Sequence, residues 1–312
     1  MVAAPVLTDR RAAEVWAWVG ALVSHLDPAG TSGQSLVALG SPTVDTEGDH
    51  AQLVGTGRVV VKLHATHTAP AELEARLDAI QRPGLSQFWV QPLWPEVFVA
   101  PDGRLVTAWP RVRPLGTSDP VPWTRAGRLL AALHQTAVPA TTPQAPLPRD
   151  GGATRLRRAA AGVRLFGRRD LLWLADLGDR LADALARRAT SVWVHGDFHL
   201  GQLAQPSSGS RWLLLDVDDM GVGDPAWDLA RVAGFWAAGL LEDQAWHQFL
   251  AAYRQAGGPA IPAAAHDPWP FLDVPAQAAV VIAASRALSR SGGTSVPRSL
   301  LAACRTMKER TA

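Results

Sequence analysis

Short runs of apolar and β-branched residues recur through the first hundred positions of the chain. Three of them are separated by turns rich in glycine and aspartate, and they occupy residues 35–39, 51–54 and 57–63. This pattern is typical of antiparallel strands joined by short loops. A helix is expected next, at residues 69–80, because its apolar residues follow helical spacing and a proline lies near its start. The first part of the chain is therefore predicted to form a small sheet that carries one helix.

A second pair of strands is expected in residues 96–109. The turn-forming residues 101–103, Pro-Asp-Gly, lie there between two strand-like runs. The segment that follows, residues 110–123, is dense in proline and has no periodic pattern, which favours a connection between two parts of the chain. We place the boundary between these parts near residue 112.

Helical spacing of apolar residues dominates the rest of the chain. Residues 123–136 carry one apolar stripe, and residues 153–189 form an arginine-rich helical stretch. Further helices are expected at residues 242–256, 275–289 and 297–310. The charges of the arginine-rich stretch are interpreted as a solvated face, since charge runs usually are. The pattern thus predicts an α+β protein whose second part is mainly helical.

The size and composition of the chain fit two globular lobes. Its 312 residues are many for one compact core, and 47% hydrophobic with 19% charged residues argues against disorder. Lys and Arg number 30 against 28 Asp and Glu, so no basic surface for nucleic acid is indicated. The single cysteine, Cys304, excludes an internal disulfide and a thiolate metal cluster.

Neither export nor a membrane anchor is expected. The first residues, through Arg10 and Arg11, lack the basic segment followed by an apolar one that marks a signal peptide. The apolar run at residues 276–284 is shorter than the ~20 residues that a bilayer span needs. We therefore expect a cytoplasmic protein, a monomer or a homodimer, that has neither nucleic acid nor a membrane as a partner.

Acidic residues gather in residues 191–231, the segment with the strongest chemical signals. Two apolar strands there end in polar residues: the strand at 192–194 in His195, Gly196 and Asp197, and the strand at 212–215 in Asp216, Asp218 and Asp219. Residues 206–210 are typical of a hairpin turn, so we expect these two strands to pair antiparallel. The loop of Asp197 would then lie close to Asp216.

Carboxylates that lie together repel one another, and burying them is costly unless a cation or hydrogen bonds compensate. The amide of Gln202 is a further candidate ligand, and no cysteine accompanies the set. Oxygen ligands of this kind suit Mg²⁺ rather than zinc. Gln202 and Asp216 are therefore predicted to bind magnesium, while Asp218 either binds a second magnesium ion or caps a turn.

The same residues fit phosphoryl transfer from ATP, which needs a base for the acceptor hydroxyl, metal ions on the phosphates and a lysine on the donor. Asp197 suits the base. Lys62, near the end of the apolar strand VVVKL, suits the lysine, and its expected ion-pair partner is Glu74 or, second, Glu72 on the following helix. The loop at residues 40–48 is a candidate to cover the nucleotide phosphates.

Three elements of the chain resemble one known family: HGDFHLGQ, LLLDVDD and GDPAWDLAR. With VVVKL and AGRLLAALHQTAVP they are similar, in order and over nearly the whole chain, to the aminoglycoside phosphotransferase and choline kinase superfamily, distant relatives of protein kinases. The resemblance implies a two-lobed protein-kinase-like fold. Residues 1–112 would be the nucleotide-binding lobe and hinge, and residues 113–312 the catalytic and substrate-binding lobe.

Residue roles follow from this resemblance: Asp197 as the catalytic base, Asp216 as the magnesium carboxylate, Lys62 as the phosphate lysine and Glu74 as its partner. ATP and Mg²⁺ are the implied cofactors. The resemblance also implies that Asp228 braces the catalytic loop. The family most often has asparagine where this chain has Gln202. That glutamine is similar to the pattern of maltokinases and related sugar kinases, which favours a sugar as the acceptor.

Other polar residues near this segment have simpler explanations. Asp224 and Pro225 fit the N-cap and N1 positions of a helix over AWDLAR. His195 and His199 are interpreted as hydrogen-bonded structural residues rather than metal ligands. Asp219 is interpreted as solvent-facing.

The leading hypothesis is a kinase that transfers the γ-phosphate of ATP to a hydroxyl of a sugar, an amino sugar or an aminoglycoside-like compound. Trp227, Trp236 and Trp246 are candidates to stack on a sugar ring. The main alternative is a catalytically idle kinase-like regulator that binds nucleotide or metabolite. A hydrolase that uses Asp197 as its nucleophile is a third hypothesis, and both antibiotic resistance and sugar metabolism stay open as roles.

Overall fold

The computed structural model describes residues 10–26, 37–39, 52–56, 58–116, 119–140, 147–188, 192–205 and 211–310. The chain divides into two compact units, Met1–Arg113 and Pro114–Ala312. This division falls beside residue 112, where the proline-rich connection is expected. The loop at residues 40–48, the candidate cover for nucleotide phosphates, lies outside the described residues.

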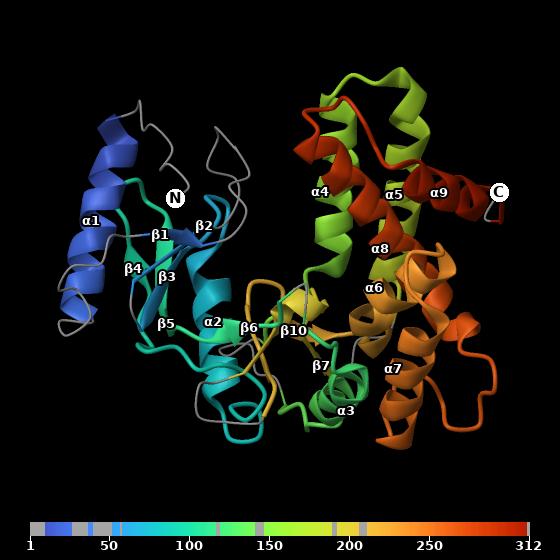
Figure 1. The fold of residues 1–312 in the computed structure, drawn as a ribbon, viewed down its shortest axis with the longest axis horizontal. Coiled ribbons are helices and arrows are strands. Elements are labelled where there is room, and N and C mark those ends of the chain that lie inside the picture. The colour runs from blue at the N-terminus through green and yellow to red at the C-terminus, as the bar shows by residue number, and fades with distance from the viewer. Residues whose placement is uncertain are drawn as a thin grey trace. The chain divides into compact units, whose positions relative to one another are not determined.

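A five-stranded antiparallel sheet forms the centre of the first unit (Figure 1). Its strands are β1 (Val37–Leu39), β2 (Gln52–Thr56), β3 (Val59–Leu63), β4 (Phe98–Val99) and β5 (Leu105–Pro110), in the spatial order β1-β2-β3-β5-β4. The hairpins β2–β3 and β4–β5 form where the apolar runs predict them, so these predictions are confirmed. Most residues of β3 are buried, as its β-branched composition favours.

Two helices belong to the first unit. The predicted helix is confirmed as α2 (Pro70–Gln81), which has its proline at the first helical position. A further helix, α1 (Arg10–Leu26), has no counterpart among the predicted elements. Its buried residues follow helical spacing and share a core with β2, β3 and β5: Val15, Val19, Leu22, Val23 and Leu26. This apolar stripe is the sequence signal for α1.

Short strands in the second unit form two small sheets. β7 (Val192–Val194) pairs antiparallel with β10 (Gly221–Gly223). β8 (Leu203–Gln205) pairs antiparallel with β9 (Leu213–Leu214), and β6 (Arg113–Pro114), at the boundary of the units, borders β8. The prediction that residues 192–194 pair with residues 212–215 is therefore wrong. After β7 the chain forms a short 3-10 helix, η2 (Leu200–Gln202), and then β8. It is β8, and not β7, that pairs with β9.

Helices make up most of the second unit: α3 (Trp123–His134), α4 (Gly152–Leu165), α5 (Leu172–Ala186), α6 (Pro225–Ala237), α7 (Asp243–Gln255), α8 (Trp269–Arg290) and α9 (Arg298–Arg310). The predicted helical segments are confirmed, although residues 153–189 contain two helices, with a short 3-10 helix, η1 (Arg169–Leu171), before α5. α4, α5, α6, α8 and α9 pack around a shared apolar core (Figure 1).

α8 begins at Trp269 rather than at the predicted Pro275, which lies inside the helix. Proline has no amide hydrogen to donate to the carbonyl four residues earlier, here that of Phe271. The guanidinium of Arg188 donates a hydrogen bond of 2.9 Å to this carbonyl instead. This hydrogen bond from Arg188 helps α8 to continue past Pro275, although proline usually ends a helix.

Among the helices of the described residues, α8 alone is long and apolar enough to cross a membrane by length and composition. Of its apolar window, 67% is buried inside the unit, where α8 packs on α6, α4 and α5. Packing in the core therefore accounts for its apolar character.

α6 begins as its sequence predicts. The carboxylate of Asp224 accepts a hydrogen bond of 3.0 Å from the amide of Ala226, and Pro225 occupies the first helical position. Asp224 also forms an ion pair with Arg188. The N-cap interpretation of Asp224 is therefore confirmed.

Replacing Asp224 with alanine should lower the free energy of unfolding by about 0.5–2 kcal/mol, because the first turn of α6 loses its acceptor. Urea unfolding followed by circular dichroism measures this change. The matched control is Asp183→Ala, since Asp183 makes a surface ion pair with Arg157 that is worth about 0–1 kcal/mol. Equal stability of Asp224→Ala and the unmodified protein would contradict the capping role.

Candidate active site

Asp197 lies in the loop that follows β7. The residue before it, Gly196, has a φ of +83°, in the left-handed region that favours glycine. A Cβ atom on Gly196 would also collide with the carbonyl of Asp219. Only glycine therefore lets the backbone turn here and bring Asp197 beside the segment that contains Asp219.

Asp228 on α6 holds this loop in place. Its carboxylate accepts hydrogen bonds from the backbone amides of His195 at 2.7 Å and Gly196 at 2.8 Å. It also receives a hydrogen bond of 3.0 Å from Nε2 of His134, and the neighbouring Trp227 donates from Nε1 to the carbonyl of Gly196 at 2.6 Å. Asp228 is fully buried. These contacts confirm that Asp228 braces the loop.

His195 joins the loop of Asp197 to the segment before Asp216. Its Nε2 contacts the carbonyl of Leu215 at 2.7 Å, and its Nδ1 accepts a hydrogen bond of 3.2 Å from the amide of Asp197. Since a carbonyl can only accept, these partners assign the proton to Nε2. The expected closeness of the Asp197 loop and Asp216 is thus confirmed, through a side chain instead of strand pairing.

His199 also has a structural role. Its Nδ1 accepts a hydrogen bond of 3.0 Å from the amide of Gly201 and so caps η2. Burial, helped by the nearby charge of Arg231, lowers the pKa of His199 to about 4, so the ring is neutral at pH 7. The interpretation of His195 and His199 as structural residues is confirmed by their hydrogen bonds.

Gln202, Asp216 and Asp218 lie where β8 and β9 meet the loops. The amide of Leu215 donates to the carbonyl of Gln202 at 2.8 Å, which sets Gln202 next to the turn that contains the two aspartates. The carboxylate of Asp216 accepts a hydrogen bond of 2.9 Å from the amide of Asp218. Among the described residues, Asp216 is the only non-glycine with a positive φ, at +66°. Strained backbone of this kind clusters at functional sites.

The donor atoms of these three side chains are oxygens, two carboxylates and one amide, which suits Mg²⁺. In the part of the chain that the structure describes, no group of three or more His, Cys, Asp or Glu could hold a metal ion. A metal cage built from protein alone is therefore not indicated there. Mg²⁺ that arrives with phosphates needs only one or two carboxylates, and the donor set fits that case.

Lys62 and Glu74 belong to the first unit. Lys62 lies on β3 opposite Thr107 of β5 and is only 6% exposed. Glu74 lies exposed on α2, while the alternative partner Glu72 contacts Arg76 at 3.5 Å. The ion pair between Lys62 and Glu74 stays a prediction.

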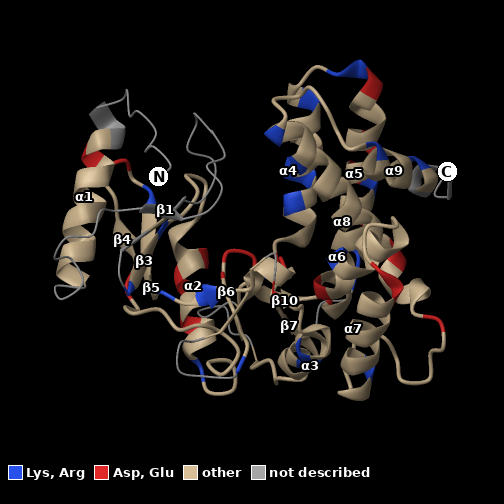
Figure 2. Ribbon diagram, in the orientation of Figure 1, with Lys and Arg blue, Asp and Glu red and all other residues tan. Residues whose placement is uncertain are grey.

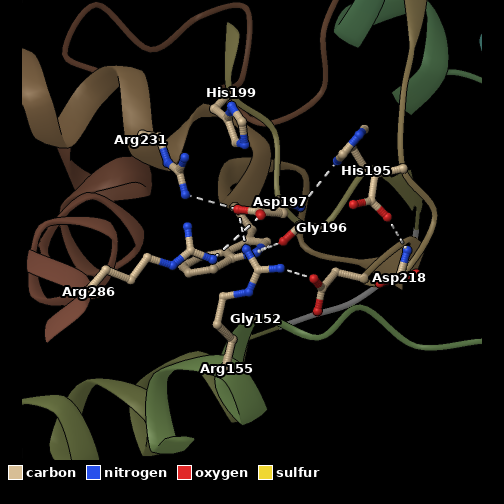
Figure 3. Close-up of polar contacts among 12 residues, drawn as sticks. Gly152, Arg155, His195, Gly196, Asp197, His199, Asp218, Arg231 and Arg286 are labelled. Atoms are coloured by element: carbon tan, nitrogen blue, oxygen red, sulfur yellow. Dashed lines mark hydrogen bonds and ion pairs between the residues drawn. The ribbon is translucent and has the colours of Figure 1, made fainter. Parts of the chain in front are cut away.

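Three arginines from three helices surround Asp197 (Figure 3). Arg155 of α4 forms ion pairs with both Asp197 and Asp219. Arg231 of α6 donates a hydrogen bond of 3.0 Å to Asp197, and Nη2 of Arg286 on α8 lies 3.7 Å from its other oxygen. The interpretation of Asp219 as solvent-facing is wrong, because its carboxylate turns inward to Arg155.

The other arginines of residues 153–189 differ from Arg155. Basic residues recur along α4 (Figure 2), and surface ion pairs link this helix to α5: Arg157 with Asp183, and Arg164 with Asp176 and Asp179. The solvated-face interpretation is confirmed for these pairs. It is wrong for Arg155, which follows the buried side of α4 toward Asp197.

The protonation of this cluster reflects a competition between burial and charge. Burial by itself would raise the pKa of Asp197, but Arg155, Arg231 and Arg286 outweigh it and lower that pKa to about 2. Burial lowers the pKa of Arg231 to about 10, against the opposing attraction of Asp197. At neutral pH the carboxylate is therefore an anion and Arg231 a cation.

Packing accounts for the tryptophans that were candidates for sugar stacking. Trp236 stacks on Trp246 with ring centroids 5.3 Å apart and on Trp269 at 5.8 Å. Trp246 is only 2% exposed, and Trp227 is held by its hydrogen bond to the carbonyl of Gly196. These rings contribute to the core of the second unit.

Comparison with known proteins gives a family and a fold. The family model for the phosphotransferase enzyme family, APH, matches residues 47–272. Among curated proteins, none matches the chain.

Similar solved structures cover nearly the whole chain. A choline kinase from Streptococcus pneumoniae is 12% identical, with 94% of this chain and 97% of that chain covered and a TM-score of 0.59. An aminoglycoside 2'-phosphotransferase, solved as a GDP complex, is 14% identical over 95% and 99% with a TM-score of 0.55. A spectinomycin phosphotransferase, solved with ADP and spectinomycin, is 15% identical over 93% of each chain with a TM-score of 0.52. At these identities the likeness shows the fold alone, an α+β kinase-like fold.

Proposed function

Because the chain belongs to the phosphotransferase enzyme family, we propose that it transfers the γ-phosphate of ATP to a hydroxyl group of a small molecule. One observation carries the proposal. The carboxylate of Asp197 lies on a loop fixed by Asp228 and joined through His195 to the segment before Asp216. A base for the acceptor beside a metal-binding carboxylate is what phosphoryl transfer requires.

Asp197 acts as the base in this proposal. The acceptor hydroxyl donates a hydrogen bond to Asp197, and its oxygen forms a bond to the γ-phosphorus of ATP. The bond from the γ-phosphorus to the oxygen that bridges the β-phosphate breaks, ADP leaves, and the hydroxyl proton passes to Asp197. The lowered pKa keeps this carboxylate ionised at neutral pH, so it can accept the hydrogen bond.

Gln202, Asp216 and Asp218 would hold Mg²⁺, with Asp218 as a ligand of a second ion. A Mg²⁺ ion held there would supply positive charge that offsets the charge developing on the phosphate oxygens. Gln202 has the same amide oxygen as the asparagine that the family most often has, on a side chain one methylene longer. The oxygen-only donor set supports this assignment.

Lys62 is the proposed phosphate lysine of the first unit, with Glu74 as its ion-pair partner. Its position on a buried strand supports the role, because the sheet fixes the backbone from which the lysine side chain extends. Residues 1–112 are accordingly proposed as the nucleotide-binding lobe and hinge. Residues 113–312 are proposed to carry catalysis and acceptor binding.

The proposed acceptors are sugars, amino sugars and aminoglycoside-like compounds. The glutamine in HGDFHLGQ supports sugars, because this variant is similar to that of maltokinases. The proposal places the reaction in the cytoplasm, without nucleic acid or membrane, in metabolism or in antibiotic resistance.

Adding one class of small alcohol to the protein with ATP and Mg²⁺ should release ADP in proportion to the acceptor consumed. The measurement is coupled ADP release across sugars, amino sugars, aminoglycosides and amino alcohols, with EDTA as the control that removes the metal. ADP release that is the same with and without every acceptor would indicate hydrolysis and contradict the transfer reaction.

A second candidate function is a catalytically idle regulator that binds a nucleotide. The ion pair between Arg155 and Asp197 favours this function. The guanidinium of Arg155 occupies the carboxylate, and this contact must break before Asp197 can accept a hydrogen bond from a hydroxyl group. ATP binding measured by calorimetry, combined with no ADP release for any acceptor, would support the regulator over the kinase.

A further inference from the structure

Arginine side chains gather around Asp197 in the second unit. Three guanidinium groups, those of Arg155, Arg231 and Arg286, converge on it from α4, α6 and α8 (Figure 3). The carboxylates that they contact are those of Asp197 and Asp219. Three guanidinium groups therefore surround these two carboxylates, and the charge of Asp216 also acts on Arg155.

Arg231 and Arg286 keep donors for a ligand. A guanidinium has five N–H donors, and within the described residues Arg231 uses one of them on Asp197. The 3.7 Å between Arg286 and Asp197 is longer than a hydrogen bond. The two arginine side chains are 24% and 41% exposed, so a solute can reach them.

A small hollow lies beside Asp197 among the helices of the second unit. Its lining includes the charged residues Arg155, Asp197 and Arg231, together with the apolar residues Ala279 and Ile282 of α8. An anionic group of an acceptor that reaches Asp197 would therefore lie near the guanidinium of Arg231.

Grouping cations in a partly buried place costs free energy unless anions compensate. Burial lowers the pKa of Arg155 and that of Arg231, while the charge of Asp197 opposes this effect. Arginine binds phosphate and carboxylate through paired, charge-assisted hydrogen bonds, so an anionic ligand would offset it. Two acidic residues of the second unit, Asp243 and Asp273, form hydrogen bonds with Trp236 and Gln277.

We infer that the acceptor carries an anionic group, a phosphate or a carboxylate, close to the hydroxyl that is phosphorylated. Arg231 and Arg286 bind this anion, and Arg155 positions Asp197 and Asp219. The inference rests on the proposed kinase function and narrows its acceptor class. A polycation such as an aminoglycoside does not fit a site with this charge.

Binding of small alcohols that differ only in charge tests the inference without requiring turnover. One series is glucose, glucosamine, glucuronate and glucose 6-phosphate, and a second is glycerol, serinol, glycerate and glycerol 3-phosphate. Calorimetry is performed on the full chain with Mg²⁺ and a non-hydrolysable ATP analogue. In at least one series the anionic members should bind about tenfold tighter or more than the neutral and cationic ones, as hydrogen bonds between charged groups imply.

Arg286→Gln and Arg231→Gln should each reduce this preference by about tenfold, since each removes one cation from the anion. The matched control is Arg180→Gln, at an exposed position on α5, which should leave the preference unchanged. Circular dichroism identifies a variant that fails to fold. If one variant does, the binding preference of the other variant is the test.

Several results would overturn the inference. They are equal binding of all charge forms, tighter binding of the cationic forms, a preference that survives in both variants, and an equal loss of affinity for the ATP analogue. The last result would assign the arginines to the transferred phosphate. Anions that bind without ADP release would instead support the charge preference and count against the kinase function. Turnover of neutral or cationic alcohols alone would support the kinase and overturn the anionic acceptor.

Discussion

Replacing Asp197 with asparagine should lower kcat for phosphoryl transfer by about 10²–10⁴-fold, the range that loss of a general base produces. Asparagine keeps the size of the side chain but cannot take the hydroxyl proton. The Kd for ATP should change by less than about threefold, because the nucleotide phosphates are held by the lysine and the metal. Acceptor-dependent ADP release and calorimetric titration with ATP measure the two quantities.

The matched control for this variant is Asp183→Asn. Asp183 lies on the surface of α5, where it pairs with Arg157, and its loss should leave kcat unchanged. Unchanged turnover in Asp197→Asn would show that another group takes the proton, and the mechanism proposed above would be wrong. A fall in ATP affinity as large as the fall in kcat would place Asp197 in nucleotide binding instead.

Replacing Asp228 with alanine should both destabilise the protein and inactivate it. The buried amides of His195 and Gly196 lose their acceptor, as does His134. Since each buried polar group without a partner costs about 1–3 kcal/mol, the loss of these contacts should lower the free energy of unfolding by about 3 kcal/mol or more. Urea unfolding measures this loss, and activity is measured under conditions in which the variant is still folded.

The activity of the folded Asp228→Ala variant distinguishes bracing from chemistry. Asp228 acts through the loop, so kcat should fall while the pH profile of the remaining activity keeps its shape. Asp224→Ala, at the start of the same helix, is the comparison, because it weakens α6 without removing an acceptor from the loop. Similar stability and similar kcat in both variants would contradict a specific bracing role for Asp228.

Local sequence patterns predicted most of the elements, because the apolar residues of one helix face or one strand face recur at a regular spacing that a short stretch of sequence already shows. The apolar run of β3 and the stripe of α3 are examples, and both lie where the sequence predicts them. The first helix, α1, was not predicted, although Val15, Val19 and Leu22 show the same helical spacing. The sequence predicted that α8 starts at Pro275. It could not show that Arg188, which lies outside the helix, supplies a hydrogen bond in place of the one that the proline cannot donate.

Strand pairing was predicted less well than the strands themselves. The turn signal at residues 206–210 suggested a hairpin between the strands at residues 192–194 and 212–215. In the structure β7 pairs with β10, a three-residue strand of which two residues are glycine. Its two glycines give it little strand propensity, and the backbone of its middle residue, Val222, is also hydrogen-bonded to that of Pro148 and Asp150.

The sequence by itself determined which residues carry the proposed chemistry. Asp197, Gln202 and Asp216 lie within one short segment, and the motif around them names a family that the comparison confirms. Their closeness in space comes from the fold, through the hydrogen bond between His195 and the carbonyl of Leu215.

Only the tertiary structure decided the electrostatic surroundings of Asp197. Arg155, Arg231 and Arg286 lie far apart in the chain, and an arginine in a helix gives no sign of the residue it will meet. Packing of α4, α6 and α8 around one apolar core turns all three toward the same carboxylate. Charge acts through space and not along the chain, so the charge of the site, and with it the inferred anionic acceptor, follows only from the folded arrangement.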